Sequence, residues 1–200
     1  MSTFKEKMNE KIRTYSDKSY LDGYIKNEFL TDNGNADIFL KVYNKYDLFD
    51  SRTSGEQLDL LDSIYSFIEN KTSMLESDIQ IDLHIIGCKL DNKDQESVRH
   101  IIKEHYAIEL YKIQKEYVKY RERMLDLFAV GFGALFLYSF FYFYTEFGFF
   151  LTILSFLFIF SLSEAIDIYI GTLHDIKKNR EDITQNLLMH ITFENEEKDN

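Results

Sequence analysis

The sequence predicts an α+β protein in which a small cytoplasmic sheet-and-helix domain is interrupted by a two-helix transmembrane hairpin. Charge is the first observation: residues 127–163 contain one charged residue, Glu146, whereas the other 163 of the 200 residues contain 56. Periodicity is the second, because the rest of the chain switches between helical and strand spacing. The chain is accordingly divided into a cytoplasmic α+β domain (1–106), a basic helical stalk (107–126), two transmembrane helices (127–144 and 147–170) and a cytoplasmic helix and strand that return to the sheet (171–200).

The first part of the domain is predicted to hold a helix and a β-hairpin. Apolar side chains in residues 4–16 share one helical stripe, which indicates an amphipathic helix that docks on the domain or on the inner leaflet. Residues 24–30 and 37–43 flank an Asn33-Gly34 pair, which readily adopts the positive φ of a tight turn. The second arm alternates apolar and polar residues, so it is the clearer of the two strands.

The second part of the domain is predicted to form a helix, a strand and a further helix. Ser54 and Gln57 give a capping-box pattern ahead of an amphipathic helix over about 55–71. Apolar residues then alternate over 78–87, which predicts a strand with one buried face. Asp91 is a candidate N-cap for the next helix, which leads through the charged stalk into the first span.

Two uncharged stretches of 18 and 17 residues, at 127–144 and 147–163, predict the membrane hairpin. At about 1.5 Å per residue they cover roughly 25–27 Å, and flanking apolar residues extend them toward the ~30 Å hydrocarbon core. A single helix of both stretches would be too long and would bury Glu146 near its middle. The alternative is a buried helical pair of a soluble protein.

Flanking charges predict the orientation of the hairpin. Eight basic residues flank the two spans on one side, and the turn carries none, which places both termini in the cytoplasm of a cell with the hairpin in its inner (plasma) membrane. The N-terminal residues lack an apolar segment, so the first span is expected to direct insertion itself. The eight are Lys112, Lys115, Lys119, Arg121, Arg123, Lys177, Lys178 and Arg180.

The end of the chain is predicted to rejoin the sheet. A polar helix gives way near Leu188 to residues 189–194, where apolar and polar side chains alternate. If this strand pairs with 37–43 or with 79–86, both ends of the hairpin are tied to one domain. A change in the domain is then mechanically coupled to the membrane helices.

Composition argues against several classes of function. A formal net charge of −11 is opposed to nucleic-acid binding. One cysteine excludes a disulfide framework and any cysteine-based zinc or iron–sulfur cluster. No nucleotide loop, redox pair or nucleophile–base arrangement is evident, so we expect no enzyme activity, no catalytic residue and no cofactor.

Histidines and carboxylates are the candidate metal ligands of the sequence. His100 and His105 are five residues apart, about 140° around a helix, and so cannot share a metal with Glu104 in the usual way. His84 and Cys88 lie close in sequence but lack an evident third ligand. The carboxylates near the second helix could bind a divalent cation, although turn and cap roles explain them more simply; these are Asp47, Asp50, Asp59 and Asp62. We therefore predict no metal site.

The polar residues of greatest interest lie at the cytoplasmic boundary of the second span. Glu164 and Asp167 are three apart on one helix face, with His174 further along the same stripe. Acids within a span are functional candidates by default. Near the headgroups they are hydrated, so interface packing or pairing with Arg121 or Arg123 is favoured over a proton or ion role.

Small residues inside the spans are candidates for helix packing. Ala129 and Gly133 are four apart, as are Ser161 and Ala165, which is the spacing that lets helix backbones approach closely in a membrane. The contact is either between the two helices of one chain or between copies. The expected partners are the lipid bilayer and either a second copy or another membrane protein, with no nucleic acid.

The order of elements resembles that of known proteins. The segments DLFD, LDLLDSIYSFIENK, IDLHIIG and HYAIEL, followed by two spans and SEAIDI, are similar to small bacterial proteins with two transmembrane helices whose roles are uncharacterised. The two spans joined to a small β-containing domain also resemble membrane effectors of bacterial anti-phage systems. That likeness implies ligand sensing followed by membrane damage; the alternative is an accessory or anchoring subunit of a transporter or enzyme complex.

Overall fold

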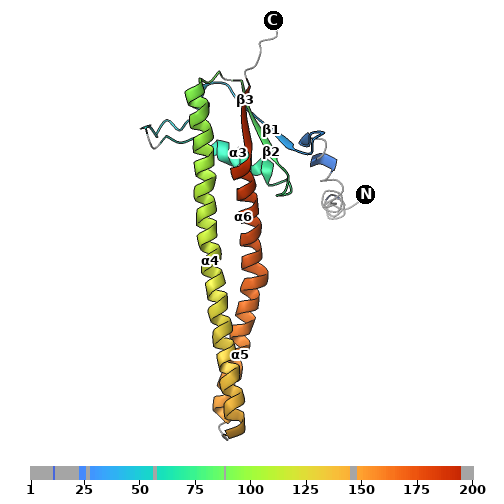
Figure 1. Cartoon of the computed structure of the whole chain (residues 1–200), viewed down its shortest axis with the longest axis vertical. Helices are drawn as coiled ribbons and strands as arrows, with labels where there is room; N and C mark the ends of the chain where they lie inside the picture. The colour runs from blue at the N-terminus through green and yellow to red at the C-terminus, as the bar shows by residue number, and fades with distance from the viewer. Residues whose placement is uncertain are drawn as a thin grey trace, which may run out of the picture. The chain divides into compact units, whose positions relative to one another are not determined.

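The computed structural model describes residue 11 and residues 23–25, 28–55, 58–87, 89–144 and 148–194. The chain divides into two compact units. Unit 1 comprises residues 1–107 and 184–200 and holds the sheet, and unit 2 comprises residues 108–183 and holds a helical hairpin (Figure 1). The helix predicted over residues 4–16 lies outside the described residues, apart from Lys11.

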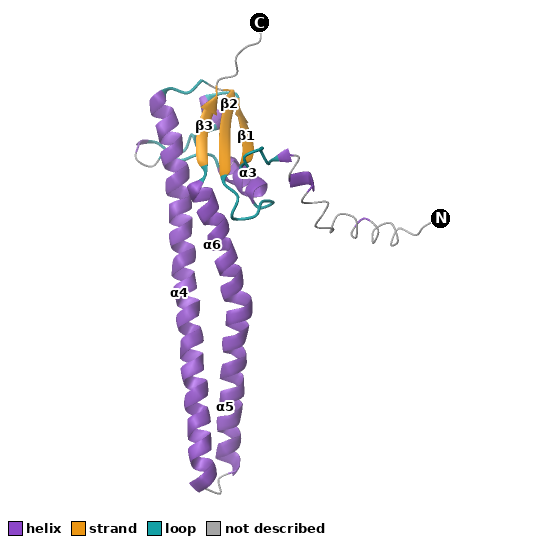
Figure 2. Cartoon of the chain, turned by 45° about the vertical axis from the view of Figure 1, so that its right-hand side comes forward, coloured by secondary structure: helices purple, strands orange, loops and turns teal. Residues whose placement is uncertain are grey.

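Unit 1 is built on a three-stranded parallel sheet (Figure 2). Its strands β1 (Ala36–Val42), β2 (Ile81–Gly87) and β3 (His190–Glu194) lie in that order. Each is a strand that alternation had predicted, and β3 pairs with β2, one of its two expected partners. The fold is therefore mixed α/β with a parallel sheet.

The predicted β-hairpin over 24–30 and 37–43 is wrong. Gly34 does make a turn at a φ of 83°, but the two arms share a single antiparallel bridge, from Leu30 to Ala36. The first arm follows helical spacing, since Ile25 and Phe29 are four apart, are both buried and are joined by a helical backbone hydrogen bond of 3.0 Å. β1 instead pairs along its whole length with β2.

Helix α3 (Asp62–Thr72) begins seven residues later than predicted. The preceding residues are extended because they pair with an earlier segment: Leu61 N–H donates to Leu48 O (2.8 Å), and Phe49 and Leu60 form an antiparallel bridge. Leu60 is only 2% exposed, so its burial fixes this extended path. Gln57 of the predicted capping box lies outside the described residues.

The core of unit 1 lies on one face of the sheet. Alternate strand residues are buried, as predicted from the period of two, and buried side chains of α3 and of the first turns of α4 (Asn92–Tyr144) complete the core. The other face carries mostly polar residues, together with Phe39 and Ile86. Fully or almost fully buried residues include Ile38, Val42, Ile68, Ile81, Leu83, Val98, Ile102 and Tyr106.

The two parallel strand pairs require two crossovers, and they differ in length. The first, from β1 to β2, contains α3. The second, from β2 to β3, contains the whole of unit 2: α4, then α5 (Gly148–Asp167), the π-helical turn η3 (Ile168–Thr172) and α6 (Leu173–Leu188). The helical hairpin is thus an insertion within a crossover of the sheet.

Two tyrosines of the core predict how stability depends on pH. Burial, followed by the 2.6 Å hydrogen bond to Asp59, raises the pKa of Tyr65, and burial raises the pKa of Tyr106. An unfolded tyrosine loses its proton near pH ~10. Above that pH the unfolded state therefore binds fewer protons than the folded state, and folding stability falls as pH rises.

We expect urea unfolding midpoints of the full-length protein, followed by circular dichroism of the backbone, to fall steeply above pH ~10. Tyr106→Phe should weaken this fall and leave stability at pH 7 unchanged or higher, because the buried Tyr106 hydroxyl has no hydrogen-bond partner among the described residues. Tyr65→Phe should cost about 1 kcal/mol at pH 7 through loss of its bond to Asp59. Equal effects of the two variants at pH 7 would contradict this assignment.

Candidate functional site

Two helices of the structure are long and apolar enough to cross a membrane. They are the predicted spans, extended by the polar helices that adjoin them: Asn92–Phe143 and Gly148–Leu188. Only 11% and 17% of their most apolar stretches are buried, whereas a helix in the core of a soluble protein is mostly buried. Large apolar side chains such as Phe136 and Phe149 are 71% and 82% exposed. These features weakly favour a membrane location.

Small residues line the contact between α4 and α5 inside unit 2. Ser161 and Ala165 are buried, as is Ala134 on α4. A Cβ atom added at Gly131 would lie 3.4 Å from the Cβ of Ser161, so the helices approach closely at that residue. The intrachain contact therefore uses Ser161 and Ala165 from the predicted set.

The other two predicted packing residues face away from this contact. Ala129 and Gly133 are exposed, and a Cβ atom added at Gly133 would meet nothing within 4 Å. Neither residue is buried by the other helix of the same chain. Their role in contact between copies stays a prediction.

The two glycines give a matched pair of variants. Gly131→Leu is expected to separate the helices and to lower the stability of the hairpin by about 1–3 kcal/mol, because the added side chain meets Ser161 and the backbone of Phe158. Gly133→Leu adds the same atoms in a position that is open within one chain, so it should cost far less in a monomeric preparation. SDS-induced unfolding of the full-length protein, followed by circular dichroism, measures both. A larger loss for Gly133→Leu would show that position 133 is buried by another molecule.

An ion pair lies at the predicted boundary of the spans. Arg123 Nη2 donates to Glu164 Oε1 at 3.0 Å, which joins α4 to α5. This confirms the predicted pairing of Glu164 and selects Arg123 over Arg121. Asp167, one helical turn further, is exposed, and a proton or ion role for either acid remains the less favoured of the two roles that the sequence left open.

The helix changes geometry just beyond that ion pair. Residues Ile168–Thr172 form the π-helical turn η3, and α6 follows without a break. A π turn contains an extra residue and rotates the helix face that follows; such turns often occur at functional sites. Sequence patterns did not indicate it. Gly171, a weak helix former within the turn, is the only local signal.

His174, the third predicted boundary residue, lines a groove within unit 2. This groove has a volume of about 560 Å³ and lies between α4 and the segment formed by η3 and α6. We call it the base groove, after the basic side chains among its lining residues. Its basic side chains other than His174 are Lys177 and Arg180. The remaining lining residues are Tyr117, Tyr169, Ile170 and Leu173.

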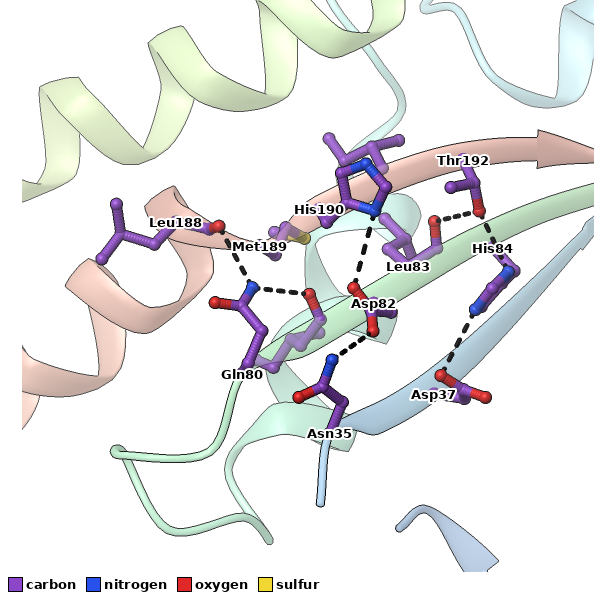
Figure 3. A network of polar contacts seen from close by, with 12 residues as sticks. Asn35, Asp37, Gln80, Asp82, Leu83, His84, Leu188, Met189, His190 and Thr192 are labelled. Atoms are coloured by element: carbon purple, nitrogen blue, oxygen red, sulfur yellow. Dashed lines mark hydrogen bonds and ion pairs between the residues drawn. The ribbon is translucent and has the colours of Figure 1, made fainter. Parts of the chain in front are cut away.

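A polar network crosses the open face of the sheet in unit 1 (Figure 3). His84 on β2 lies at its centre, with its Nδ1 atom 2.9 Å from Glu194 Oε1 and 3.0 Å from Thr192 Oγ1 of β3. Its Nε2 atom lies 3.4 Å from Asp37 of β1, without the geometry of a hydrogen bond, and its ring stacks on Phe39. The network therefore links all three strands.

Three side chains fasten the returning chain to unit 1, and we call Arg99, Lys103 and Gln185 the return clamp. Lys103 Nζ donates to the carbonyl oxygens of Leu187 and Met189. Burial lowers the pKa of this amine, while the two carbonyls favour its charged form. The positive charge also faces the negative end of the α6 dipole.

The other two members of the return clamp bind backbone carbonyls on either side. Arg99 Nε donates to Ile191 O at 3.2 Å, and its guanidinium lies over the Phe193 ring. Gln185 Nε2 donates to Glu76 O and to Ile79 O at 2.8 and 2.7 Å. Sequence reasoning missed all three residues because their partners are backbone atoms about 84 to 109 positions away.

The candidate metal ligands have other partners. His105 stacks on Tyr65, with ring centroids 3.7 Å apart, whereas His100 lies on the exposed side near Glu104. Among the described residues, no group of three or more His, Cys, Asp or Glu side chains could hold a metal ion. Cys88 lies outside them.

The four carboxylates near α3 serve turns and helix ends. Asp47 completes the cap of the short 3₁₀ helix η1 (Lys45–Asp47), and Asp50 pairs with Arg52 at 2.7 Å. Asp59 accepts from Tyr65, and Asp62 starts α3. Turn and cap roles were the simpler of the two explanations that the sequence had left open, the other being a divalent-cation site.

Comparison with known proteins adds no relative: no protein-family model matches the chain, and the searches of curated proteins and of solved structures returned no match.

Proposed function

We propose that this chain is an integral inner-membrane protein whose unit 1 lies in the cytoplasm, binds a ligand or partner, and thereby controls the transmembrane hairpin. The observation that carries the proposal is the connectivity. The hairpin is the crossover between β2 and β3, so the chain leaves unit 1 through α4 and re-enters it through α6.

Both connections are helical. α4 is a single helix of 53 residues that starts in unit 1 and includes the first span, so the predicted stalk is part of it. α5, η3 and α6 follow one another without a gap until Leu188. Helices transmit rotation or displacement along their axes better than flexible linkers, which supports coupling between the units.

The return clamp supports coupling where the chain re-enters unit 1. Lys103 belongs to α4, and the carbonyls that it binds end α6 and begin β3. The ends of both helices are therefore bonded to each other inside unit 1. A ligand that shifted the sheet would act on both helices, provided that it bound the shifted state more tightly.

Membrane damage in bacterial defence is the proposed outcome of this control. It rests on the resemblance to two-span effectors and on the exposed small residues Ala129 and Gly133, which fit contact between copies. The same exposed surface also fits a different membrane protein. An accessory or anchoring subunit is therefore the second candidate function.

Light scattering and dye release separate the two candidates. The full-length protein in mild detergent is expected to be a homo-oligomer, and after reconstitution it should release dye from liposomes of phosphatidylethanolamine and phosphatidylglycerol. A variant that fails to oligomerise, with leucine at Ala129 and Gly133, should release less dye at the same protein-to-lipid ratio. A monomer that leaves liposomes intact would contradict the effector and favour the accessory subunit.

A further inference from the structure

We propose that the base groove binds the headgroup of an anionic phospholipid from the cytoplasmic leaflet. The inference rests on the proposed membrane location of the hairpin and adds a ligand site to it. The groove has a volume of about 560 Å³, which is within the range of small-molecule sites.

The charge of the lining is the first argument. Lys177 and Arg180 line the groove with His174, and no carboxylate does, although the chain as a whole has a net charge of −11. Lys177 Nζ lies 3.8 Å from Glu181 Oε1, in a loose and exposed ion pair. An anion can therefore compete for this amine.

The guanidinium of Arg180 is already oriented. Its Nη1 atom donates to Gln114 Oε1 at 3.3 Å, and its central carbon lies 5.2 Å from the centroid of the Tyr117 ring. The aromatic ring and the hydrogen bond together restrict the rotation of the guanidinium. Arginine held in this way binds phosphate with less loss of side-chain freedom.

The order of the lining residues along the helix is the second argument. Tyr169 and Ile170 come first, and Lys177 and Arg180 follow up to 11 residues, or about 16 Å, later. The groove thus changes from apolar to basic along the helix. A phospholipid has the same order, from acyl chain to phosphate.

The position along the hairpin agrees with the depth of a headgroup. Tyr169 is 21 residues beyond Gly148, the start of α5, which is about 32 Å of helix, and Lys177 is 29 residues beyond it, which is about 44 Å. The hydrocarbon core is about 30 Å thick, and 40–45 Å with headgroups. Basic pockets at this level favour anionic lipids over free anions, because only a lipid fills the apolar end.

Native mass spectrometry of the full-length protein in mild detergent tests the proposal. Dioleoylphosphatidylglycerol should bind about tenfold or more tightly than dioleoylphosphatidylcholine, and Lys177→Gln combined with Arg180→Gln should abolish the difference. The matched control is Lys115→Gln with Lys178→Gln, which removes the same charge from residues that do not line the groove. It should retain the preference.

A single variant and a competition with inorganic phosphate complete the experiment. Lys177→Gln alone, which leaves the contacts of Arg180 intact, should still weaken phosphatidylglycerol binding several-fold. Equal binding of both lipids, or equal loss in the control, would overturn the proposal. Displacement of phosphatidylglycerol by millimolar inorganic phosphate would assign the groove to a soluble anion and also overturn it.

Carbonate extraction of the same variants distinguishes this inference from the proposed function. Protein that resists extraction but shows no phosphatidylglycerol preference refutes the lipid site alone. Release of the protein by carbonate would refute the membrane hairpin, and therefore also the location of the groove at a membrane surface.

Discussion

Gly87→Ala is expected to lower the free energy of unfolding of unit 1 by roughly 2–5 kcal/mol, the largest effect of any single methyl group considered for this protein. Gly87 ends β2 with a φ of 109°, a backbone conformation that residues other than glycine rarely adopt. An added Cβ atom would also lie 2.6 Å from the carbonyl oxygen of Val42, on the neighbouring strand. The strained φ and the close contact therefore both destabilise the variant, and the Val42 carbonyl cannot easily move because it belongs to the backbone of β1.

Gly34→Ala is the matched control. Gly34 also has a positive φ, 83°, but an added Cβ atom would meet nothing within 4 Å. Its cost should be limited to the left-handed conformation, about 1–2 kcal/mol. Urea unfolding of the full-length protein in mild detergent measures both variants. Equal losses would show that β1 and β2 are not in close contact at Gly87.

Lys103→Met is expected to cost about 1.5–3 kcal/mol, because it removes a charged donor from two carbonyl oxygens where α6 meets β3. Methionine keeps most of the apolar volume, so the loss reports the hydrogen bonds. If unit 1 controls the hairpin, this variant should also change dye release. The control is Lys93→Met on an exposed position of the same helix, which should change stability by about 0.5 kcal/mol or less.

Hydrogen exchange distinguishes a local effect from a global one. In Lys103→Met, the amides of β3 should exchange faster than those of β1, because β3 loses its link to α4 while β1 keeps its pairing with β2. Uniformly faster exchange across the sheet would indicate that the return clamp merely adds to overall stability.

Local patterns predicted the elements because each depends on side chains close in sequence. The alternation of Ile81, Leu83 and Ile85 follows from one buried sheet face, and the uncharged stretches predicted two apolar helices that are long enough to cross a membrane. The strand at 190–194 was found in the same way. The pairing of Glu164 with Arg121 or Arg123 followed instead from the antiparallel arrangement expected for the hairpin, and the structure selects Arg123. These features placed the hairpin between two strands of one sheet.

Pairing and register could not be predicted because they depend on residues far apart. The Asn33-Gly34 pair favours a turn whether or not its arms pair, and the position beside β1 was taken by β2 from 45 residues away. The start of α3 was shifted by the burial of Leu60 against an earlier segment. The return clamp likewise joins side chains to backbone carbonyls, which carry no sequence signal.

Labelling of single cysteines in spheroplasts tests the central claim most directly. In a Cys88→Ser background, Gly148→Cys lies at the start of α5, and Ser73→Cys lies at an exposed position just after α3. We expect a membrane-impermeant maleimide to label Gly148→Cys in intact spheroplasts and Ser73→Cys only after permeabilisation. Labelling of Ser73→Cys from outside, or protection of both cysteines until lysis, would contradict a hairpin that crosses the membrane twice and returns to a cytoplasmic sheet.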